Sequence, residues 1–356
     1  MNEQKVALIT GIFGQDASYL SELLLSKNYK VIGTKRRAST ENPWRIEHLL
    51  NNKNLIIENG DVTDFSNMLH LIDNYRFHEI YNLAAQSFVA ASFDEPLHTF
   101  EVDAIGPINI LEATRVIQRN TNHIIKYYQA STSELWGDQF DTVYDNDGNV
   151  LYNYQDENTE MNPQSPYAVA KLAAHKMTQL YRNAYGMFCC CGILMNHESP
   201  RRGEEFVTKK ISKYVGRVYK EIKKMGLLQM SNEEKTSIIT NKIGKLQLGN
   251  LSASRDWGHS RDYMLAAWQM LQQDIPDDYV ICTEETHTVE EFLKLAFSEI
   301  GVNNYMDFVN INSKYMRPAE VLFLRGRCTK AKEKLKWKAN ITFRDLVKDM
   351  VIYDCK

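Results

Sequence analysis

Short apolar runs alternate with helical patterns along the first 200 residues, and this alternation constrains the fold more than any other feature. The apolar runs cover residues 5–10, 30–34, 54–64, 79–85, 124–132 and 188–196. Between them, apolar residues recur three or four positions apart, as in amphipathic helices, including one long pattern over residues 98–119. Strands joined by helices run parallel and carry helices on both faces. With right-handed crossovers, the chain is predicted to be α/β, with a doubly wound parallel Rossmann sheet.

The pattern changes after residue 200. Residues 201–260 are polar and mixed, and short strands and helices continue to the C-terminus. A chain of 356 residues is long for one core. We therefore expect residues 1–200 to form the Rossmann domain. Residues 201–356 should form a smaller α/β region over the carboxyl edge of the sheet, with the chain able to cross back to the first domain.

Residues 137–162 are acidic and rich in turn-forming residues. The stretch DNDGN at 145–149 resembles part of a calcium loop, but the glycine comes too early and no glutamate closes the pattern. An Asp-Gly pair between two runs rich in Tyr and Val is an ordinary hairpin signal. We predict a β-hairpin here, and no metal site.

Composition and charge exclude several classes of protein. The net charge is −3, so no basic field favours nucleic acid. No run of eighteen uncharged apolar residues predicts a membrane span, and the N-terminus lacks a secretory pattern. The six cysteines include three in succession, Cys189 to Cys191, without metal-ligand spacing. We interpret them as buried packing thiols in a cytoplasmic protein.

A glycine-rich turn follows the first predicted strand. Gly11, Gly14 and Ala17 have the spacing G-x-x-G-x-x-A, at the start of the first predicted helix. The first glycine permits a tight turn, and the second lets the backbone approach a pyrophosphate. The third small residue allows close packing of helix on strand. This context predicts a dinucleotide site, with the phosphates at the helix N-terminus.

The end of the second predicted strand selects the dinucleotide. It reads Thr34-Lys35-Arg36-Arg37, without the acid that usually bonds the ribose 2′-hydroxyl of NAD. A carboxylate would repel a 2′-phosphate, whereas an arginine binds one with two hydrogen bonds. We therefore predict NADP, anchored by Arg36. Asp61 ends the third strand, where a carboxylate can bond the adenine amine.

Four residues near the end of the fifth predicted strand indicate chemistry. Thr132 and Glu134 lie at its carboxyl end, where ligands of open α/β sheets bind. Tyr167 and Lys171 are four apart in the next helix and share one face. A cation beside a phenol lowers the phenol's pKa. The pair can act as the base that removes a hydroxyl proton while hydride leaves the same carbon. If Glu134 were only structural, the protein would be a dehydrogenase, an epimerase or a reductase.

Together these features resemble the extended short-chain dehydrogenase/reductase family, and within it the GDP-mannose 4,6-dehydratases. The resemblance covers nearly the whole chain outside insertions at about 138–155 and 222–242. It rests on the stretches ALITGIFGQDASYL, KRRAS, RIEHLL, YQASTSELWG, PQSPYAVAKL, GILMNHESPRRGEEFVTKKI, LGNLSASRDWGHSRDYM and RPAEV.

The resemblance implies a reaction and a set of site residues. C4 of a GDP-linked sugar is oxidised by NADP while Tyr167 takes the proton, Glu134 removes the C5 proton, water leaves from C6, and the hydride returns to C6. Thr132 would hydrogen-bond the C4 oxygen or help the leaving hydroxyl. Residues 1–200 would bind NADP and part of the substrate, and residues 201–356 mainly the nucleotide sugar. The predicted cofactor set is Gly11, Phe13, Gly14, Gln15, Asp16, Arg36, Asp61, Val62, Leu83, Ala84, Ala85, Ser87, Lys171, His197 and Arg202. The predicted substrate set is Ser87, Asn196, Lys210, Arg255, Arg317 and Glu320.

Alternatives follow from the departures from the family pattern. Ala17 replaces a usual glycine, and Leu322 and Arg327 replace expected acids. A related enzyme could therefore act on a GDP-heptose or a GDP-amino sugar, as a dehydratase or a C4 dehydrogenase. A regulator that binds the dinucleotide without turnover is the non-enzyme alternative. The segment 35–45 resembles a loop that reaches a neighbouring subunit, which implies a homodimer or homotetramer.

Overall fold

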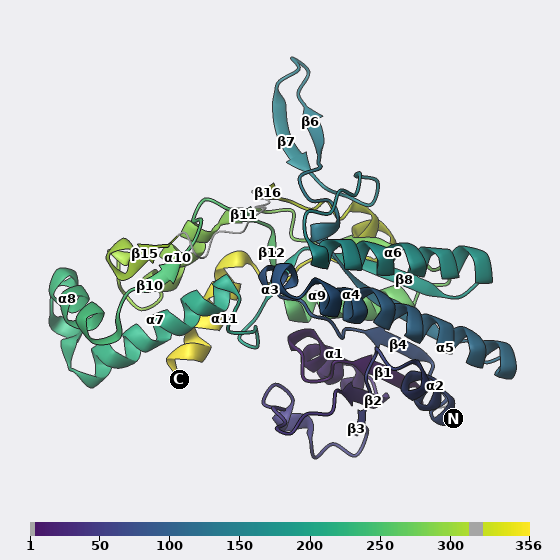
Figure 1. Ribbon diagram of the computed structural model, residues 1–356. Coiled ribbons are helices and arrows are strands. Elements are labelled where there is room, and N and C mark those ends of the chain that lie inside the picture. Colours follow the sequence, from purple (N-terminus) through teal and green to yellow (C-terminus); the bar gives the residue numbers. More distant parts are fainter. Residues whose placement is uncertain (1–3, 313–322) are drawn as a thin grey trace.

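In the computed structural model, which describes residues 4–312 and 323–356, the core is a seven-stranded parallel sheet (Figure 1). Its order is β13-β8-β5-β4-β1-β2-β3. The strands are β1 (Val6–Thr10), β2 (Lys30–Lys35), β3 (Leu55–Asn59), β4 (Glu79–Asn82), β5 (Lys126–Thr132), β8 (Cys189–Leu194) and β13 (Tyr279–Ile281). The order turns back between β1 and β4, which is where doubly wound sheets bind ligands. The predicted Rossmann fold is confirmed.

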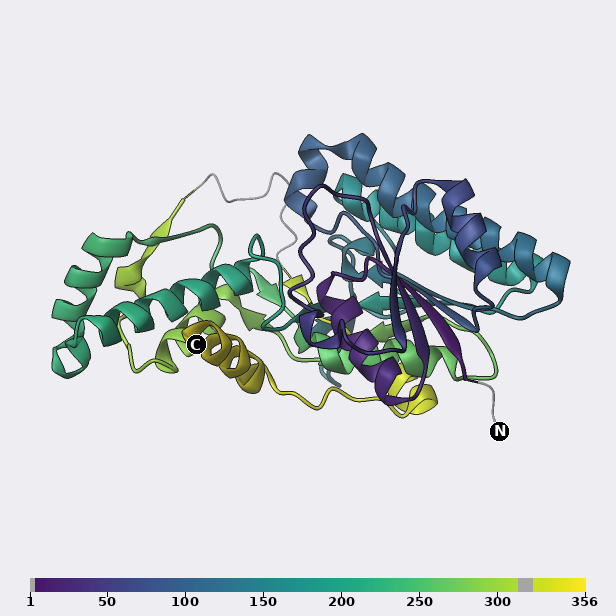
Figure 2. The same ribbon diagram turned by 90° about the horizontal axis from the view of Figure 1, so that it is seen from below.

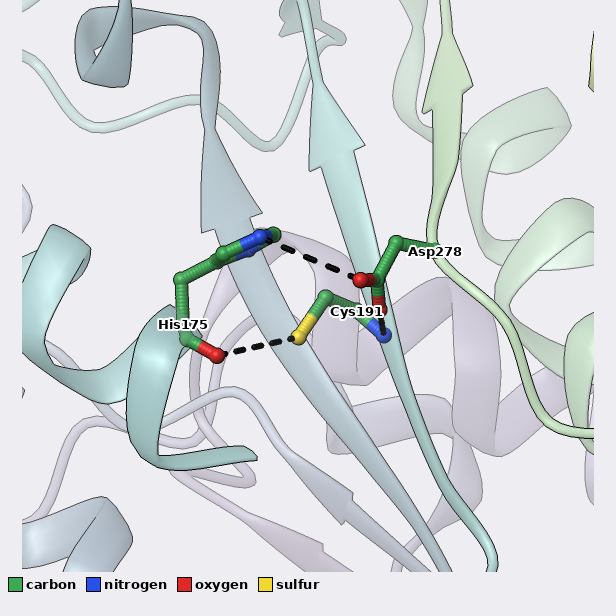
Figure 3. A group of neighbouring side chains, drawn as sticks. All are labelled: His175, Cys191 and Asp278. Atoms are coloured by element: carbon green, nitrogen blue, oxygen red, sulfur yellow. Dashed lines mark hydrogen bonds and ion pairs between the residues drawn. The ribbon is translucent and has the colours of Figure 1, made fainter. Parts of the chain in front are cut away.

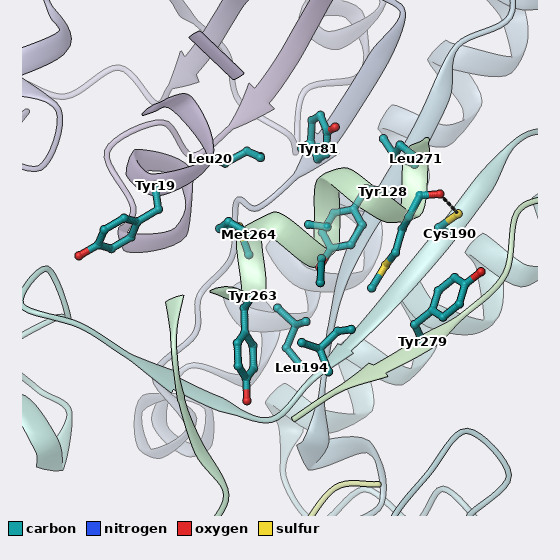
Figure 4. Packing of buried hydrophobic residues seen from close by; sticks show 14 of the residues in the cluster. Tyr19, Leu20, Tyr81, Tyr128, Cys190, Leu194, Tyr263, Met264, Leu271 and Tyr279 are labelled. Atoms are coloured by element: carbon teal, nitrogen blue, oxygen red, sulfur yellow. Dashed lines mark hydrogen bonds between the residues drawn. The ribbon is translucent and has the colours of Figure 1, made fainter. Parts of the chain in front are cut away.

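Helices cover both faces of this sheet. They are α1 (Gln15–Ser26), α2 (Phe65–Asn74), α3 (Val89–Asp94), α4 (Pro96–Phe100), α5 (Gly106–Thr121), α6 (Pro166–Tyr185) and α9 (Ser260–Leu271). Successive strand residues face opposite sides, so Leu8 packs with α2 and α5 whereas Ile9 packs with α1 and α9. Figure 4 shows the second of these layers, where Tyr128 and Leu194 lie beside Met264 of α9.

Three predicted elements have different bounds in the structure. The strands predicted over 54–64 and 79–85 end at Asn59 and Asn82, so Asp61 and Leu83 lie in loops. The helix predicted over 98–119 is divided into α4, a π-helical turn η2 (Glu101–Ile105) and α5. Apolar spacing predicts a helix but does not distinguish i→i+4 from i→i+5 hydrogen bonding.

The second half of the chain builds a separate core beside the sheet (Figure 2). Its helices are α7 (Val207–Lys224), α8 (Asn232–Ile243), α10 (Val289–Ser298) and α11 (Phe343–Cys355). Its strand pairs are β9 (Asn196–Glu198) with β12 (Trp257–His259), and β10 (Leu246–Leu248) with β15 (Val309–Ile311). A third group places β11 (Ser254–Arg255) between β14 (His287–Thr288) and β16 (Phe323–Leu324). The same half also supplies α9 and β13 to the Rossmann sheet. Among the described residues, no helix is long and apolar enough to span a membrane.

Besides η2, five short 3-10 or π-helical turns are described. They are η1 (Glu47–Leu49), η3 (Ser133–Leu135), η4 (Leu227–Gln229), η5 (Tyr305–Phe308) and η7 (Ala331–Leu335).

The predicted hairpin is confirmed and projects from the body of the protein (Figure 1). It pairs β6 (Asp141–Tyr144) with β7 (Val150–Tyr154). Its base is fastened to the segment after residue 322, because Gln155 pairs with Gly326. Arg327 forms an ion pair with Asp156 and lies 3.5 Å above the ring of Tyr154. The family pattern has an acid at position 327. In this chain Arg327 stands there and binds the inserted hairpin.

Candidate active site

The first turn after β1 has the geometry of a phosphate-binding loop. Gly11 has φ +69°, and a Cβ there would lie 3.0 Å from the Cα of Ala84. The N–H of Gly14 donates to the carbonyl of Gly11 at 2.8 Å. Gly14 is also the N-cap of α1 and makes no side-chain cap bond. The backbone can therefore approach a ligand closely, and the positive end of the helix dipole is available to an anion.

Asp16 and His197, both predicted cofactor residues, are bonded to each other. His197 Nε2 lies 2.8 Å from Asp16 Oδ2, and Ser260 donates to Asp16 Oδ1 at 2.7 Å. Burial alone would raise the pKa of Asp16, but His197, Ser260 and Arg202 together outweigh it and lower that pKa to about 2. His197 also stacks on Tyr263, with ring centroids 4.9 Å apart. The pair thereby joins the start of α1 to β9.

Further bonds close the chain around the first turn. Gln15 donates to the carbonyl of His197 at 3.1 Å. Arg45 donates to the carbonyls of Phe13 at 3.0 Å and of Arg201 at 2.7 Å. Arg45 was not among the site residues predicted from sequence. It is the last residue of the basic segment 35–45, which could have indicated it.

The other predicted cofactor residues follow the ends of β2, β3 and β4. Arg36 is exposed directly after β2. Asp61 accepts from the N–H and the hydroxyl of Thr63 at 3.0 and 2.8 Å. The N–H groups of Leu83 and Ala84 donate to Thr10 Oγ1, both at 3.0 Å, which fixes the chain beside the glycine turn. Val62 is buried, Ala85 and Ser87 are exposed, and Arg202 lies 3.0 Å from Glu198.

The structure brings the four predicted catalytic residues together. Thr132 is the last residue of β5, and its Oγ1 accepts from the N–H of Glu134 at 3.3 Å. Tyr167 and Lys171 lie on α6, whose N-cap Ser165 accepts from Ala168 N. Lys171 Nζ lies 5.8 Å from the centre of the Tyr167 ring. A hydroxyl, a carboxylate, a phenol and an ammonium therefore meet at one strand end.

The predicted lowering of the Tyr167 pKa is wrong for the protein without ligands. Burial raises the pKa of Tyr167 well above its ordinary range, and the charge of Asp103 raises it further. The Thr132 hydroxyl acts in the opposite direction but is the smaller effect. Desolvation of a phenolate in an almost closed site outweighs a nearby cation. A positively charged ligand would favour the phenolate.

The predicted substrate residues lie mostly in the second half of the chain. Asn196 is on β9, and its Oδ1 is buried without a hydrogen-bond partner among the described residues. Lys210 is in the first turn of α7, and Arg255 is buried on β11, beside β16. Arg317 and Glu320 lie outside the described residues, as does Leu322.

Asp103 was missed by the predictions from sequence. It is fully buried on η2, and its charge acts on both Tyr167 and Lys171. A signal was present, because Thr99, Asp103, Gly106 and Ile110 form one buried stripe of the helical pattern. An acid on such a stripe needs a partner.

A Rossmann sheet with Thr132 at a strand end and Tyr-x-x-x-Lys on the next helix defines an extended short-chain dehydrogenase/reductase. Comparison with known proteins narrows this class. The sequence model of the family "GDP-mannose 4,6 dehydratase" matches residues 8–236 and 233–350. The chain belongs to the GDP-mannose 4,6-dehydratase family.

Named relatives match along almost the whole chain. GDP-mannose 4,6 dehydratase 2 of Arabidopsis thaliana is 47% identical over 357 residues, which are 99% of this chain and 87% of the relative. GDP-mannose 4,6 dehydratase of Homo sapiens is 42% identical over 373 residues, 99% of this chain and 91% of the relative.

Solved structures agree on the fold. The dTDP-glucose 4,6-dehydratase DesIV of Streptomyces venezuelae, solved with NAD and TYD bound, has a TM-score of 0.78 at 18% identity, and 98% of this chain and 96% of that chain are covered. RMD of Pseudomonas aeruginosa, solved with NADPH, has a TM-score of 0.71 at 17% identity, over 99% of each chain.

Proposed function

We propose that the protein removes water from GDP-mannose, giving GDP-4-keto-6-deoxy-mannose, with NADP as its cofactor. The observation that carries this proposal is the place of Glu134, two residues after Thr132 at the end of β5 and near enough to Tyr167 on α6 for its charge to act on that phenol. Oxidation of an alcohol needs only the hydroxyl, the phenol and the ammonium. Elimination needs one further acid or base, and Glu134 is that group.

The four residues then divide the reaction among them. Tyr167 takes the proton of the C4 hydroxyl, and Lys171 holds positive charge near the phenol. A C4 ketone acidifies the C5 proton, which Glu134 removes and passes to the C6 hydroxyl, so that this hydroxyl leaves as water. The proton that Tyr167 took from the C4 hydroxyl is then available to C5 when hydride returns to C6. Thr132 positions the C4 oxygen. When bound, a nicotinamide supplies the acceptor for the C4 hydride and the donor that returns it to C6, so the reaction is redox-neutral.

The residues of the first turn fit a dinucleotide. Gly11 and Gly14 leave room where a side chain would collide, and α1 begins without a side-chain cap. Arg36 would bind the 2′-phosphate, Asp61 the adenine, and Lys171 the ribose of the nicotinamide. Residues 201–356 would hold mainly the GDP-sugar, through Arg255 and Lys210 and through Arg317 and Glu320 outside the described residues.

Mass spectrometry tests the reaction. Purified protein with bound cofactor is incubated with GDP-mannose and no added reductant. Loss of one water from the nucleotide sugar without net formation of NADPH is the expected result. An unchanged sugar, together with turnover of a GDP-heptose or GDP-amino sugar, would refute the proposed substrate.

Arg36→Ala should change the choice of cofactor. The variant loses the guanidinium that binds the 2′-phosphate, so we expect NADP affinity to fall about tenfold to a hundredfold, the size of one or two charge-assisted hydrogen bonds. NAD affinity should stay nearly constant. Fluorescence titration with both dinucleotides measures the ratio, and the neighbouring exposed Arg37→Ala is the matched control. Equal weakening of both cofactors by Arg36→Ala would exclude the role of Arg36.

We also propose a homodimer or homotetramer, located in the cytoplasm. Large apolar side chains are exposed on the adjacent helices α4 and α6. They are Leu97, Phe100, Val169, Leu180 and Tyr185. A monomer rarely exposes so many apolar groups on neighbouring elements. Light scattering should give a multiple of 41.2 kDa, and Leu97→Glu with Val169→Glu should reduce it. A monomeric mass for the unaltered chain would exclude the proposal.

A further inference from the structure

Asp103 is a buried acid outside the four residues that the proposed reaction uses. It lies in the π-helical turn η2, within three successive buried residues, and has no exposed surface. Its Oδ1 accepts from the N–H of Gln86 at 2.8 Å. Its Oδ2 is also buried, and no described residue donates a hydrogen bond to it. A buried carboxylate with half its acceptor capacity open is costly unless a positive charge is near.

Lys171 is a buried cation whose hydrogen-bond donors are also incompletely used. Only 3% of it is exposed, and among the described residues its ammonium donates one hydrogen bond, to the carbonyl of Ala130 at 3.3 Å. An ammonium carries three donors. Burial lowers the pKa of Lys171, and the charge of Asp103 acts against this. Asp103 is the one acid among the described residues that acts on Lys171 in this way.

We propose that Asp103 is a positioning residue of the active site, whose carboxylate is the counter-ion that keeps Lys171 protonated and directed at Tyr167. The inference rests on the proposed function, in which Lys171 must carry its charge beside the phenol. Asp103 acts through Lys171 and touches no reacting atom. The π-helical turn carries this carboxylate on the inner side of the long helix; such turns recur at functional sites.

Charges on the elements packed around Asp103 define the expected pH dependence. Lys171 and Tyr167 face it from α6, and His98 faces it from α4. Burial raises the pKa of Asp103 to about 6, while Lys171 and His98 lower it. Asp103 is therefore ionised above about pH 6 and loses its charge as the pH falls below that value. Lys171 would then lose its counter-ion.

Asp103→Asn tests this with a pH profile of turnover. The variant keeps the shape of the side chain but has no charge at any pH. We expect kcat at neutral pH to fall about tenfold, and the basic limb to move about one unit toward lower pH as Lys171 deprotonates earlier. The acidic limb near pH 6 should disappear. Asp103→Glu should restore part of kcat, and His98→Gln should keep the acidic limb, which separates His98 from Asp103. If the pH profile of kcat for Asp103→Asn had the same acidic and basic limbs as that of the unaltered protein, the proposal would be overturned.

A double-mutant cycle tests the same pairing without turnover. Urea unfolding is compared for the unaltered protein, Asp103→Asn, Lys171→Met and the double variant. Lys171→Met leaves a buried carboxylate without its counter-ion, so the double variant should have a higher urea midpoint than Lys171→Met alone. Additive effects would overturn the proposal. Because this readout needs no substrate, it still decides the role of Asp103 if GDP-mannose proves not to be the substrate.

Discussion

Glu134→Gln should stop the loss of water from GDP-mannose while the protein still binds cofactor and sugar. Glutamine has nearly the same shape and can still hydrogen-bond, but it cannot take a proton from C5. Positioned acid–base groups contribute about 10²- to 10⁴-fold to a rate, so we expect kcat for dehydration to fall by that factor. Oxidation at C4 uses Tyr167 and Lys171, which the substitution leaves in place.

Two measurements separate this role from a structural one. In deuterated water, the unaltered protein should incorporate solvent deuterium at C5, and Glu134→Gln should not. The absorbance of reduced nicotinamide should instead rise in Glu134→Gln, because oxidation proceeds and elimination does not. Glu160→Gln removes an exposed carboxylate from the loop before α6 and is the matched control. Dehydration at the normal rate by Glu134→Gln would mean that another group removes the C5 proton.

Local patterns were sufficient to predict which residues meet at the end of β5. Tyr167 and Lys171 are four positions apart on a helix, and Thr132 ends a buried strand, so spacing alone placed them at one edge of the sheet. Gly11 was predictable for the same reason, since its positive φ and its closeness to Ala84 follow from the turn that the motif requires. Helices and strands of this length show a periodic pattern in the sequence, and this pattern can be recognised without knowing which distant residues they contact.

Contacts between distant parts of the chain left no such signal. β13 has three residues and joins the edge of the sheet only because β8 is already there. The sequence placed Asp16 in the cofactor set but did not predict that its carboxylate binds His197 and Ser260, which lie far along the chain. Asp103 was not predictable for the same reason, because the role that we propose for it depends on Lys171, which lies on another helix. These interactions follow from tertiary packing, which periodicity cannot report.

Asp278 is the centre of a buried polar group that joins β13 to the rest of the sheet. Arg182 donates to both of its carboxylate oxygens at 2.8 Å, and Gln179 and the N–H of Cys191 donate at 2.8 and 2.9 Å. His175 lies close to it, as Figure 3 shows, and also lies 2.9 Å from the hydroxyl of Ser131, next to Thr132. The Arg182 guanidinium and the His175 ring offset burial and lower the pKa of Asp278 to about 2. The group thereby ties α6, which carries Tyr167 and Lys171, to β8 and β13.

Asp278→Asn should therefore destabilise the protein by about 3–5 kcal/mol, the cost of removing one partner of a buried ion pair. Asparagine keeps the size of the side chain but leaves the Arg182 guanidinium without a counter-ion. The adjacent Asp277 pairs with Lys330 at the surface, so Asp277→Asn should change the free energy of unfolding by less than about 1 kcal/mol. Because the folded-state pKa of Asp278 is depressed, its contribution is complete above the unfolded-state pKa near 3.8 and is lost as the pH falls toward about 2. Urea unfolding of both variants at pH 7 and at acidic pH measures this difference. If Asp278→Asn were as stable as Asp277→Asn at pH 7, the hydrogen bonds around residue 278 would hold β13 without the ion pair, and α6 would not depend on that charge for its position.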